Sequence, residues 1–309
     1  MIILHVDPGK TMTWDQFIEQ AGPYGIALDG FVSDGPKFDP RGPWQNFNHH
    51  GFVSRLETRA TCAQVLLAIR QGLFSTFHTE EGPTAKIYVN DCDEDICLSV
   101  FLLRFGHLVE KTMNPSVNQL VTMEDFLDTT AGAYAFPKDL PSLEKLMWVF
   151  EPYHIFRASG RLDQHIKEEF YSVIADVGLR IMAFITGNSG KVTLDTRYET
   201  LETYSGWSMV KEVGRNARIG MFDDRIKAFV SVRQRPDGRY IYTIGRISQY
   251  IPFDVPTILD ALNKVEGKET IDDWGGSNTI GGSPRANGSR LTPEEVAKII
   301  NDVLAKPKK

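Results

Sequence analysis

The chain has 309 residues, of which 42% are hydrophobic and 24% charged, and its formal net charge at pH 7 is -6. This composition is typical of a soluble globular protein, and the length allows one large domain or, as we expect, two smaller ones. The acidic balance excludes a protein that coats nucleic acid non-specifically, although it is compatible with a local basic groove. The sequence has no apolar run of 18 residues, so we expect no membrane span.

The first residues and the cysteines favour a cytoplasmic protein. MIILHV is a short apolar run with no basic region before it, which predicts a strand and not a signal peptide. Cys62, Cys92 and Cys97 are odd in number and lie near predicted strand-to-helix segments. This arrangement favours reduced thiols over a disulfide framework.

The first 150 residues predict an α/β domain with a mainly parallel sheet. Short apolar runs predict strands at 1–6, 24–34 and 85–90, and apolar residues at helical spacing predict helices at 13–21, 59–72 and 95–106. In this arrangement the side chains that follow the strands meet at the carboxyl edge of the sheet, where α/β proteins bind ligands.

The rest of the chain predicts a different organisation. Residues 142–187 have helical patterns, and 161–186 is long enough for a helix that bridges two domains. RIKAFVSVRQ and RYIYTIGRIS flank RPDG, which predicts a β-hairpin with Gly238 at positive φ. LTPEEVAKIINDVLA predicts a final helix with Thr292 as its cap, Pro293 in its first turn and Glu295 at the capping-box position, followed by a frayed end. We expect domains at 1–150 and 206–309, the second a smaller α+β domain, joined by a helical linker at 151–205.

An acidic turn lies between a predicted strand and a predicted helix. VNDCDEDICLSVFLL places Asp91, Asp93 and Asp95 within five residues. Carboxylates this close repel one another and raise at least one pKa, and a divalent cation removes the conflict because it takes carboxylate oxygens as ligands. The alternative is an acidic first turn that stabilises the helix N-terminus.

Two of the seven histidines are adjacent, in the stretch NFNHHG. If this segment were a strand, His49 and His50 would point to opposite faces, and only one of them could face a given ion. The alternative is a partly exposed loop with no ligand.

Three segments together resemble the DHH phosphoesterase superfamily. DCDEDICLSVFLL is similar to its aspartate-rich metal motif, FNHHGFVSRLETRATCAQVLLAI to the Asp-His-His motif that names it, and WGGSNTIGGSPRANGSRLTPEEVAKII to the glycine-rich signature of its accessory domain. Asn48 stands where the family has Asp, Ile96 where it usually has Gly, and Ser283 where a His closes the glycine loop. The aspartate-rich turn also follows the histidines, whereas it precedes them in typical members, which implies a rearranged chain order around the same site.

The resemblance implies that residues 1–150 form a catalytic domain that binds metal ions. Asp91 and Asp93 would be ligands with Asp95 close by, and His50 would be a ligand that His49 supports, unless His49 reaches the scissile phosphate. Further aspartates would come from LDGFVSDGP and MEDFLDTT, where Asp128 matches better than Asp125 because two threonines follow it. The candidate metal ligands and catalytic residues are then Asp29, Asp34, His49, His50, Asp91, Asp93, Asp95 and Asp128.

The second domain would hold the substrate. Its glycines permit close backbone approach to an anion, and its arginines could contact phosphate. A flexible loop and a solvated strand face are the alternatives. The candidate substrate-binding residues are Arg233, Arg246, Gly275, Gly276, Gly281, Gly282 and Arg285.

The expected activity is hydrolysis of a phosphoester or phosphoanhydride. Aspartates combined with histidines favour Mn²⁺, with Mg²⁺ as the alternative, and two ions would activate the attacking water. We expect a small nucleotide, a short oligonucleotide or a polyphosphate as substrate, and no membrane or long duplex nucleic acid as partner. A single-strand exonuclease, a degenerate relative that binds a nucleotide without turnover, and assembly as a homodimer stay open.

Overall fold

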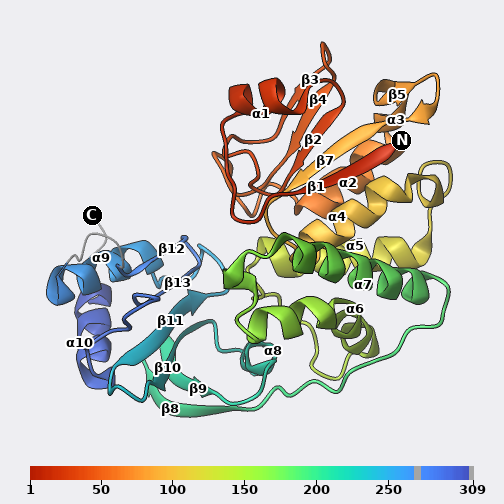
Figure 1. Ribbon diagram of the computed structural model, residues 1–309. Coiled ribbons are helices and arrows are strands. Elements are labelled where there is room, and N and C mark those ends of the chain that lie inside the picture. The colour runs from red at the N-terminus through yellow and green to blue at the C-terminus, as the bar shows by residue number, and fades with distance from the viewer. Residues whose placement is uncertain (268–272, 306–309) are drawn as a thin grey trace. The chain divides into compact units, whose positions relative to one another are not determined.

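The computed structural model describes residues 1–267 and 273–305, so the predicted frayed end beyond residue 305 lies outside the described residues. The chain forms two compact units (Figure 1). Unit 1 contains Met1–Thr129 and Pro141–Val192, and unit 2 contains Thr130–Leu140 and Thr193–Lys309. Within the described part of the chain, no helix is long and apolar enough to cross a membrane.

Unit 1 is built on a sheet with the strand order β1-β7-β2-β4-β3. All neighbours in this sheet are parallel except β3 and β4, which confirms the predicted mainly parallel sheet. Its strands are β1 (Ile2–Val6), β2 (Gly25–Leu28), β3 (Lys37–Asp39), β4 (Trp44–Phe47) and β7 (Ala85–Val89). A separate small hairpin consists of β5 (His78–Thr79) and β6 (Gly82–Pro83).

Helices cover both faces of this sheet. Ala27 and Tyr88 are register partners and pack with Phe17 of α1 in one apolar cluster. Helices α2, α4 and α7 contact the sheet at β4 or β1 and lie on the other side from α1 in Figure 1. The helices of unit 1 are α1 (Trp14–Ala21), α2 (Thr61–Arg70), α3 (Leu73–Thr76), α4 (Glu94–Arg104), α5 (Pro115–Thr129), α6 (Pro141–Ala158) and α7 (Lys167–Ile185).

The helices predicted after residue 142 are present, but they pack within unit 1. Helices α6 and α7 contact each other, and α7 also contacts α4 and β1. The hydroxyl of Tyr171 on α7 donates to the carbonyl of Leu4 at 3.0 Å. The structure therefore divides the chain differently from the expected linker at 151–205, because an apolar helix face predicts burial without identifying the surface that buries it.

Unit 2 is built on a mainly antiparallel sheet with the order β12-β13-β11-β10-β9-β8, in which β9 and β10 are a parallel pair. Its strands are β8 (Tyr198–Tyr204), β9 (Trp207–Glu212), β10 (Ala228–Gln234), β11 (Tyr240–Arg246), β12 (Gly275–Gly276) and β13 (Ile280–Gly282). The pairing of β10 with β11 confirms the predicted hairpin, and Gly238 in its turn has a φ of 84°.

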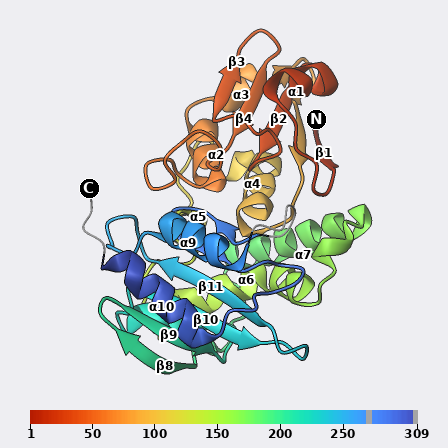
Figure 2. The same ribbon diagram turned by 90° about the vertical axis from the view of Figure 1, so that its left-hand side faces the viewer.

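The helices of unit 2 are α8 (Ala217–Asp223), α9 (Val255–Glu266) and α10 (Pro293–Leu304). Leu262 of α9 and Ile300 of α10 are buried in one cluster with Tyr242 of the sheet, and Figure 2 shows these two helices against β10 and β11. The predicted capping box of Thr292 and Glu295 is present at the start of α10.

Candidate metal centre

The carboxyl ends of three parallel strands bring the predicted residues to one edge of the sheet. Asp29 follows β2, His49 and His50 follow β4, and the acidic turn follows β7. These strands are direct neighbours, because β2 pairs with both β4 and β7. The first turn of α2 and the last turns of α5 contribute further polar groups to the same place.

Two overlapping groups of donor atoms lie at this edge. One consists of Asp29, His49 and His50, the other of His49, Asp95 and Asp128, and within each group the donor atoms are within 4.8 Å of one another. Metal–ligand bonds are about 2.0 to 2.6 Å long, so donors on opposite sides of one ion lie about 4 to 5 Å apart. Each group therefore has dimensions suitable for a divalent ion.

His49 is the common member, and its Nε2 lies among carboxylates. This nitrogen is 2.8 Å from Oδ2 of Asp128, 3.3 Å from Oδ1 of Asp29 and 3.9 Å from Oδ2 of Asp95. A single N–H can be directed at only one of these oxygens, whereas a cation attracts all three. Within the described residues, Nδ1 of His49 is buried without a hydrogen-bond partner. Such an unpaired buried nitrogen is costly.

His50 approaches the same carboxylate from a more exposed position. Its Nε2 lies 2.9 Å from Oδ1 of Asp29, and 44% of its side chain is exposed. The two imidazole rings are 4.4 Å apart between centroids. Residues 48–50 follow β4 and are not part of a strand, so the alternation expected of a strand does not apply and both histidines turn towards Asp29.

Asp29 is held in an uncommon backbone conformation. Its φ is 44°, in the left-handed region that L-residues other than Asn and Asp seldom adopt. Its Oδ1 accepts a hydrogen bond from the hydroxyl of Thr61 at 3.0 Å. Burial acts to raise the pKa of Asp29, but hydrogen bonds from His49 and His50 hold it below its ordinary value. Backbone strain at a buried carboxylate is a feature that clusters at functional sites.

Asp95 connects the acidic turn to the start of α2. Its two carboxylate oxygens accept hydrogen bonds from the backbone N–H groups of Thr61 at 2.7 Å and Cys62 at 2.6 Å. Burial, together with the charges of Asp128 and Asp29, raises the pKa of Asp95 to about 8. The sequence suggested that this aspartate lies near the site, and the structure places it in a donor group with His49.

The charge of His49 follows from the same carboxylates. Burial acts to lower the pKa of His49, but Asp128 and Asp29 raise it to about 10. Without an ion, protons bound at His49 and Asp95 therefore offset the negative charge of the neighbouring carboxylates. A divalent cation would replace those protons, because imidazole and carboxylate ligands must be deprotonated.

The carboxylates of three other predicted ligands accept hydrogen bonds from backbone N–H groups. Oδ1 of Asp91 accepts from the N–H of Cys92, Oδ1 of Asp93 accepts from Ile96 as the cap of α4, and Oδ2 of Asp34 accepts from Trp14. Burial raises the pKa of both Asp91 and Asp93, and the charge of Asp29 adds to it. Neither donor group found among the described residues includes these three aspartates, so their role as ligands stays a prediction.

Asn48 holds the loop that carries both histidines. Its side chain is buried, and Nδ2 donates to the carbonyls of Val32 at 3.1 Å and Asp34 at 2.8 Å. Its Oδ1 accepts from the N–H of His50 at 2.9 Å. The amide is therefore fully used in positioning the loop.

Two polar residues near the centre were missed from the sequence. Nη2 of Arg55 lies 3.3 Å from Oδ1 of Asp128 and 3.4 Å from Nε2 of His49; its position shortly after NHHG was the available signal. His154 of α6 lies 2.6 Å from Oε1 of Glu94 in the acidic turn. No local pattern could have found His154, because only the packing of unit 1 brings α6 to this turn.

The predicted arginines of unit 2 differ in their surroundings. Arg246 is buried and donates to the carbonyls of Asn278 at 2.8 Å and Ile251 at 3.0 Å. Arg233 and Arg285 are exposed. Phosphate contacts by these residues stay predictions.

The predicted glycine-rich loop forms the edge hairpin β12–β13. A Cβ at Gly281 would lie 2.6 Å from Cδ1 of Leu259 on α9, and a Cβ at Gly276 would lie 2.3 Å from Cα of Gly281. Gly275 and Gly282 are register partners in the same hairpin. Close packing in the hairpin thus explains why these positions are glycines. Binding of an anion by the backbone of this loop stays a prediction.

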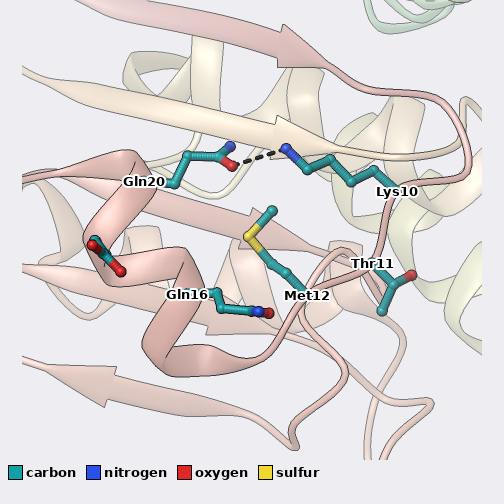
Figure 3. A pocket seen from close by; sticks show the side chains of 6 residues that line it. Lys10, Thr11, Met12, Gln16 and Gln20 are labelled. Atoms are coloured by element: carbon teal, nitrogen blue, oxygen red, sulfur yellow. Dashed lines mark hydrogen bonds between the residues drawn. The ribbon is translucent and has the colours of Figure 1, made fainter.

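A shallow pocket of about 450 Å³ lies beside α1, apart from the donor groups (Figure 3). It is lined by Lys10, Met12 and Gln20 among others, and Nζ of Lys10 donates to Oε1 of Gln20 at 2.8 Å. Asn90 fixes its wall, because Nδ2 donates to the carbonyls of Lys10 at 2.9 Å and Gly30 at 3.3 Å.

Comparison with known proteins assigns no family to this chain. No protein-family model matches its sequence, and no curated protein matches it. The resemblance to the DHH superfamily therefore stays a prediction, and the donor atoms of unit 1 are the observation from which a function can be proposed.

Proposed function

We propose that the protein is a metal-dependent phosphohydrolase of the DHH type. Its substrate would be a small phosphorylated molecule, such as a nucleotide, a short oligonucleotide or a polyphosphate. The observation that carries this proposal is the buried Nε2 of His49, which lies 2.8 to 3.9 Å from carboxylate oxygens of Asp29, Asp95 and Asp128. The motif resemblances in the sequence support the same class.

Five residues would hold the metal: Asp29, His49, His50, Asp95 and Asp128. We propose Mn²⁺, because a mixture of imidazole and carboxylate donors favours a transition metal over Mg²⁺. When bound, divalent ions would supply a water of lowered pKa and would neutralise phosphoryl charge. We propose two ions, which the two overlapping donor groups around His49 would hold between them.

The surrounding residues would keep these donors in place. Asp29 contacts both imidazoles, and the hydroxyl of Thr61 fixes one oxygen of Asp29. The amide of Asn48 fixes the backbone at His50. Because His50 is the half-exposed member of the group, the substrate would reach the centre from its side.

A protein that binds a phosphorylated ligand without turnover is the second candidate. Asn48 favours it, because the residue that stands at the first position of the DHH motif has its amide committed to the loop and offers no carboxylate. A centre with one ligand fewer would hold fewer ions or hold them more weakly.

The test measures metal binding and turnover separately. Mn²⁺ affinity and stoichiometry are measured by calorimetry, and product release is measured with bis-p-nitrophenyl phosphate, a dinucleotide and inorganic polyphosphate. Asp29→Asn is the informative variant, because Asn also tolerates positive φ and only the charge is removed. Asp163→Asn, at an exposed position, is the matched control.

The outcomes separate the candidates. A phosphohydrolase predicts tight Mn²⁺ binding and turnover in the wild type and in Asp163→Asn, with both lost in Asp29→Asn. Mn²⁺ binding without turnover of any of the three substrates supports the second candidate. If the wild type neither binds Mn²⁺ nor releases more product than Asp29→Asn, the proposal is wrong.

A further inference from the structure

We propose that Arg55 contacts the substrate at this centre and binds two oxygens of its phosphoryl group through one edge of the guanidinium. This inference rests on the proposed function, since it names the group that recognises the substrate at the same site. Arg55 lies within the segment that resembles the Asp-His-His motif, but the sequence assigned it no role, and its position in the structure singles it out.

The geometry directs one edge of Arg55 towards the donor groups. Nη2 lies 3.3 Å from Oδ1 of Asp128 and 3.4 Å from Nε2 of His49. Nε is buried and has no hydrogen-bond partner within the described residues. Nε and Nη2 form the same edge of a guanidinium, and that edge binds two oxygens of a phosphate or carboxylate side by side. One half of a two-point anion contact is therefore unused.

A neighbouring arginine in the same loop shows the alternative arrangement. Nε and Nη2 of Arg59 both donate to Oδ2 of Asp125, at 3.2 and 2.9 Å. Asp125 also accepts from the N–H of Ala60 at the start of α2. Arg59 is thus satisfied by a carboxylate that anchors the loop, whereas Arg55 has an edge that no carboxylate fills in this way.

The positive charge of Arg55 offsets the negative charge of the carboxylates at the centre. Asp29, Asp95 and Asp128 carry three negative charges when ionised, and these carboxylates repel a phosphoryl anion that approaches them. Arg55 is a cation that cannot lose its proton, and only a quarter of its side chain is exposed. It therefore supplies a fixed positive charge at the place where an anion would meet the donors.

The phosphoryl group is the anion that fits both features. The guanidinium edge takes two oxygens, and a phosphoryl group has a further oxygen to offer to the metal donors. A carboxylate has two oxygens in all and cannot satisfy both at once. Inorganic phosphate is accordingly the probe, and acetate is the comparison anion.

The test compares Arg55→Ala and Arg55→Lys with Arg59→Ala. The dissociation constants of inorganic phosphate, acetate and Mn²⁺ are measured by calorimetry, phosphate both with and without Mn²⁺, and kcat and KM are measured with bis-p-nitrophenyl phosphate. We expect Arg55→Ala to weaken phosphate binding about 10-fold or more, as for the loss of a charge-assisted hydrogen-bond pair. We expect Arg55→Lys to recover part of this loss, because it keeps the charge and loses the two-point edge.

The controls distinguish a substrate contact from a structural role. Mn²⁺ should bind to Arg55→Ala as well as to the wild type or better, because Asp128 loses a competing cation. Arg59→Ala should change phosphate affinity by less than about 2-fold, as for an arginine satisfied by a partner away from the donors. Equal losses of phosphate binding in Arg55→Ala and Arg59→Ala would show that loop order is responsible and would overturn the inference.

The failure of the proposed function has a different signature. If the wild type does not bind Mn²⁺, the phosphohydrolase proposal fails, and the phosphate affinities without metal still decide whether Arg55 binds the anion. If the wild type binds Mn²⁺ and Arg55→Ala retains wild-type phosphate affinity, the role of Arg55 is refuted while the phosphohydrolase proposal stands.

Discussion

Replacing Asn48 by Asp introduces a carboxylate beside the two histidines, and the structure predicts that this change destabilises the protein. Nδ2 of Asn48 donates to the carbonyls of Val32 and Asp34 at 3.1 and 2.8 Å. In Asn48→Asp a carboxylate oxygen would face those two carbonyl oxygens with no proton between them. The side chain is 1% exposed, so water cannot take over the lost contacts.

The magnitude follows from the groups involved. Two donated hydrogen bonds are worth about 1 kcal/mol each, and a buried carboxylate left against acceptors costs about 1 to 3 kcal/mol more. We therefore expect a loss of about 3 to 5 kcal/mol at pH 7. For a unit of this size, each kcal/mol lowers Tm by about 2 to 4 °C, so the transition of unit 1 should fall by about 6 to 20 °C.

Calorimetry on Asn48→Asp and on the control Asn188→Asp, at an exposed position, measures this effect. The loss should shrink at pH 5, because a carboxyl whose pKa is raised by burial regains a proton and with it one donor. A transition at pH 7 within about 2 °C of the wild type, or a gain of one bound Mn²⁺ without destabilisation, would show that position 48 faces the metal and that our account of its amide is wrong.

Four further predictions concern the metal centre. His49→Ala should abolish the rise in Tm that Mn²⁺ causes in the wild type, since both donor groups contain His49; a persistent rise would mean that the ion binds elsewhere. Mn²⁺ affinity should increase from pH 6 to pH 8, because the pKa of His49 is raised to about 10 and that of Asp95 to about 8, so rising pH removes protons that compete with the ion; calorimetry that gives a flat profile would contradict this. The free energy of unfolding of the metal-free protein should fall as the pH rises from 6 to 8. His49 and Asp95 have raised pKa values in the folded state, and such groups stabilise the fold only while their protons are bound. Thr61→Val should cost about 1 kcal/mol in chemical denaturation, because it removes the hydroxyl that donates to Asp29, and an unchanged midpoint would show that this contact is not formed.

The strand ends of unit 1 could be predicted from the sequence, and with them most of the candidate centre. Short apolar runs predicted strands before Asp29 and before the acidic turn and so placed these side chains at one sheet edge, as the structure has them. The strand before the histidine pair, β4, was not predicted. The choice among the aspartates could not be made from spacing. Asp95 belongs to a donor group while Asp93 caps α4, and this difference depends on how α2 and α4 pack.

Long-range packing accounts for what the sequence did not predict. Helical periodicity in 161–186 correctly predicted a long helix, α7, and Tyr171 of this helix contacts β1 within unit 1. The pairing of His154 with Glu94 spans 60 residues, and no periodic pattern encodes such a distance. Arg55 follows NHHG closely in the sequence, but its contact with Nε2 of His49 at 3.4 Å appears only in the folded chain.

The way the chain alternates between its two units has a consequence for synthesis and for dissection. Unit 1 needs Pro141–Val192, which follows the Thr130–Leu140 segment of unit 2. During synthesis on the ribosome, the face of the sheet in unit 1 would therefore stay partly uncovered until α6 and α7 have been synthesised. A fragment that stops at residue 150 cuts through α6 and leaves β1 without Tyr171, so a stable fragment with the donor groups has to extend to residue 192.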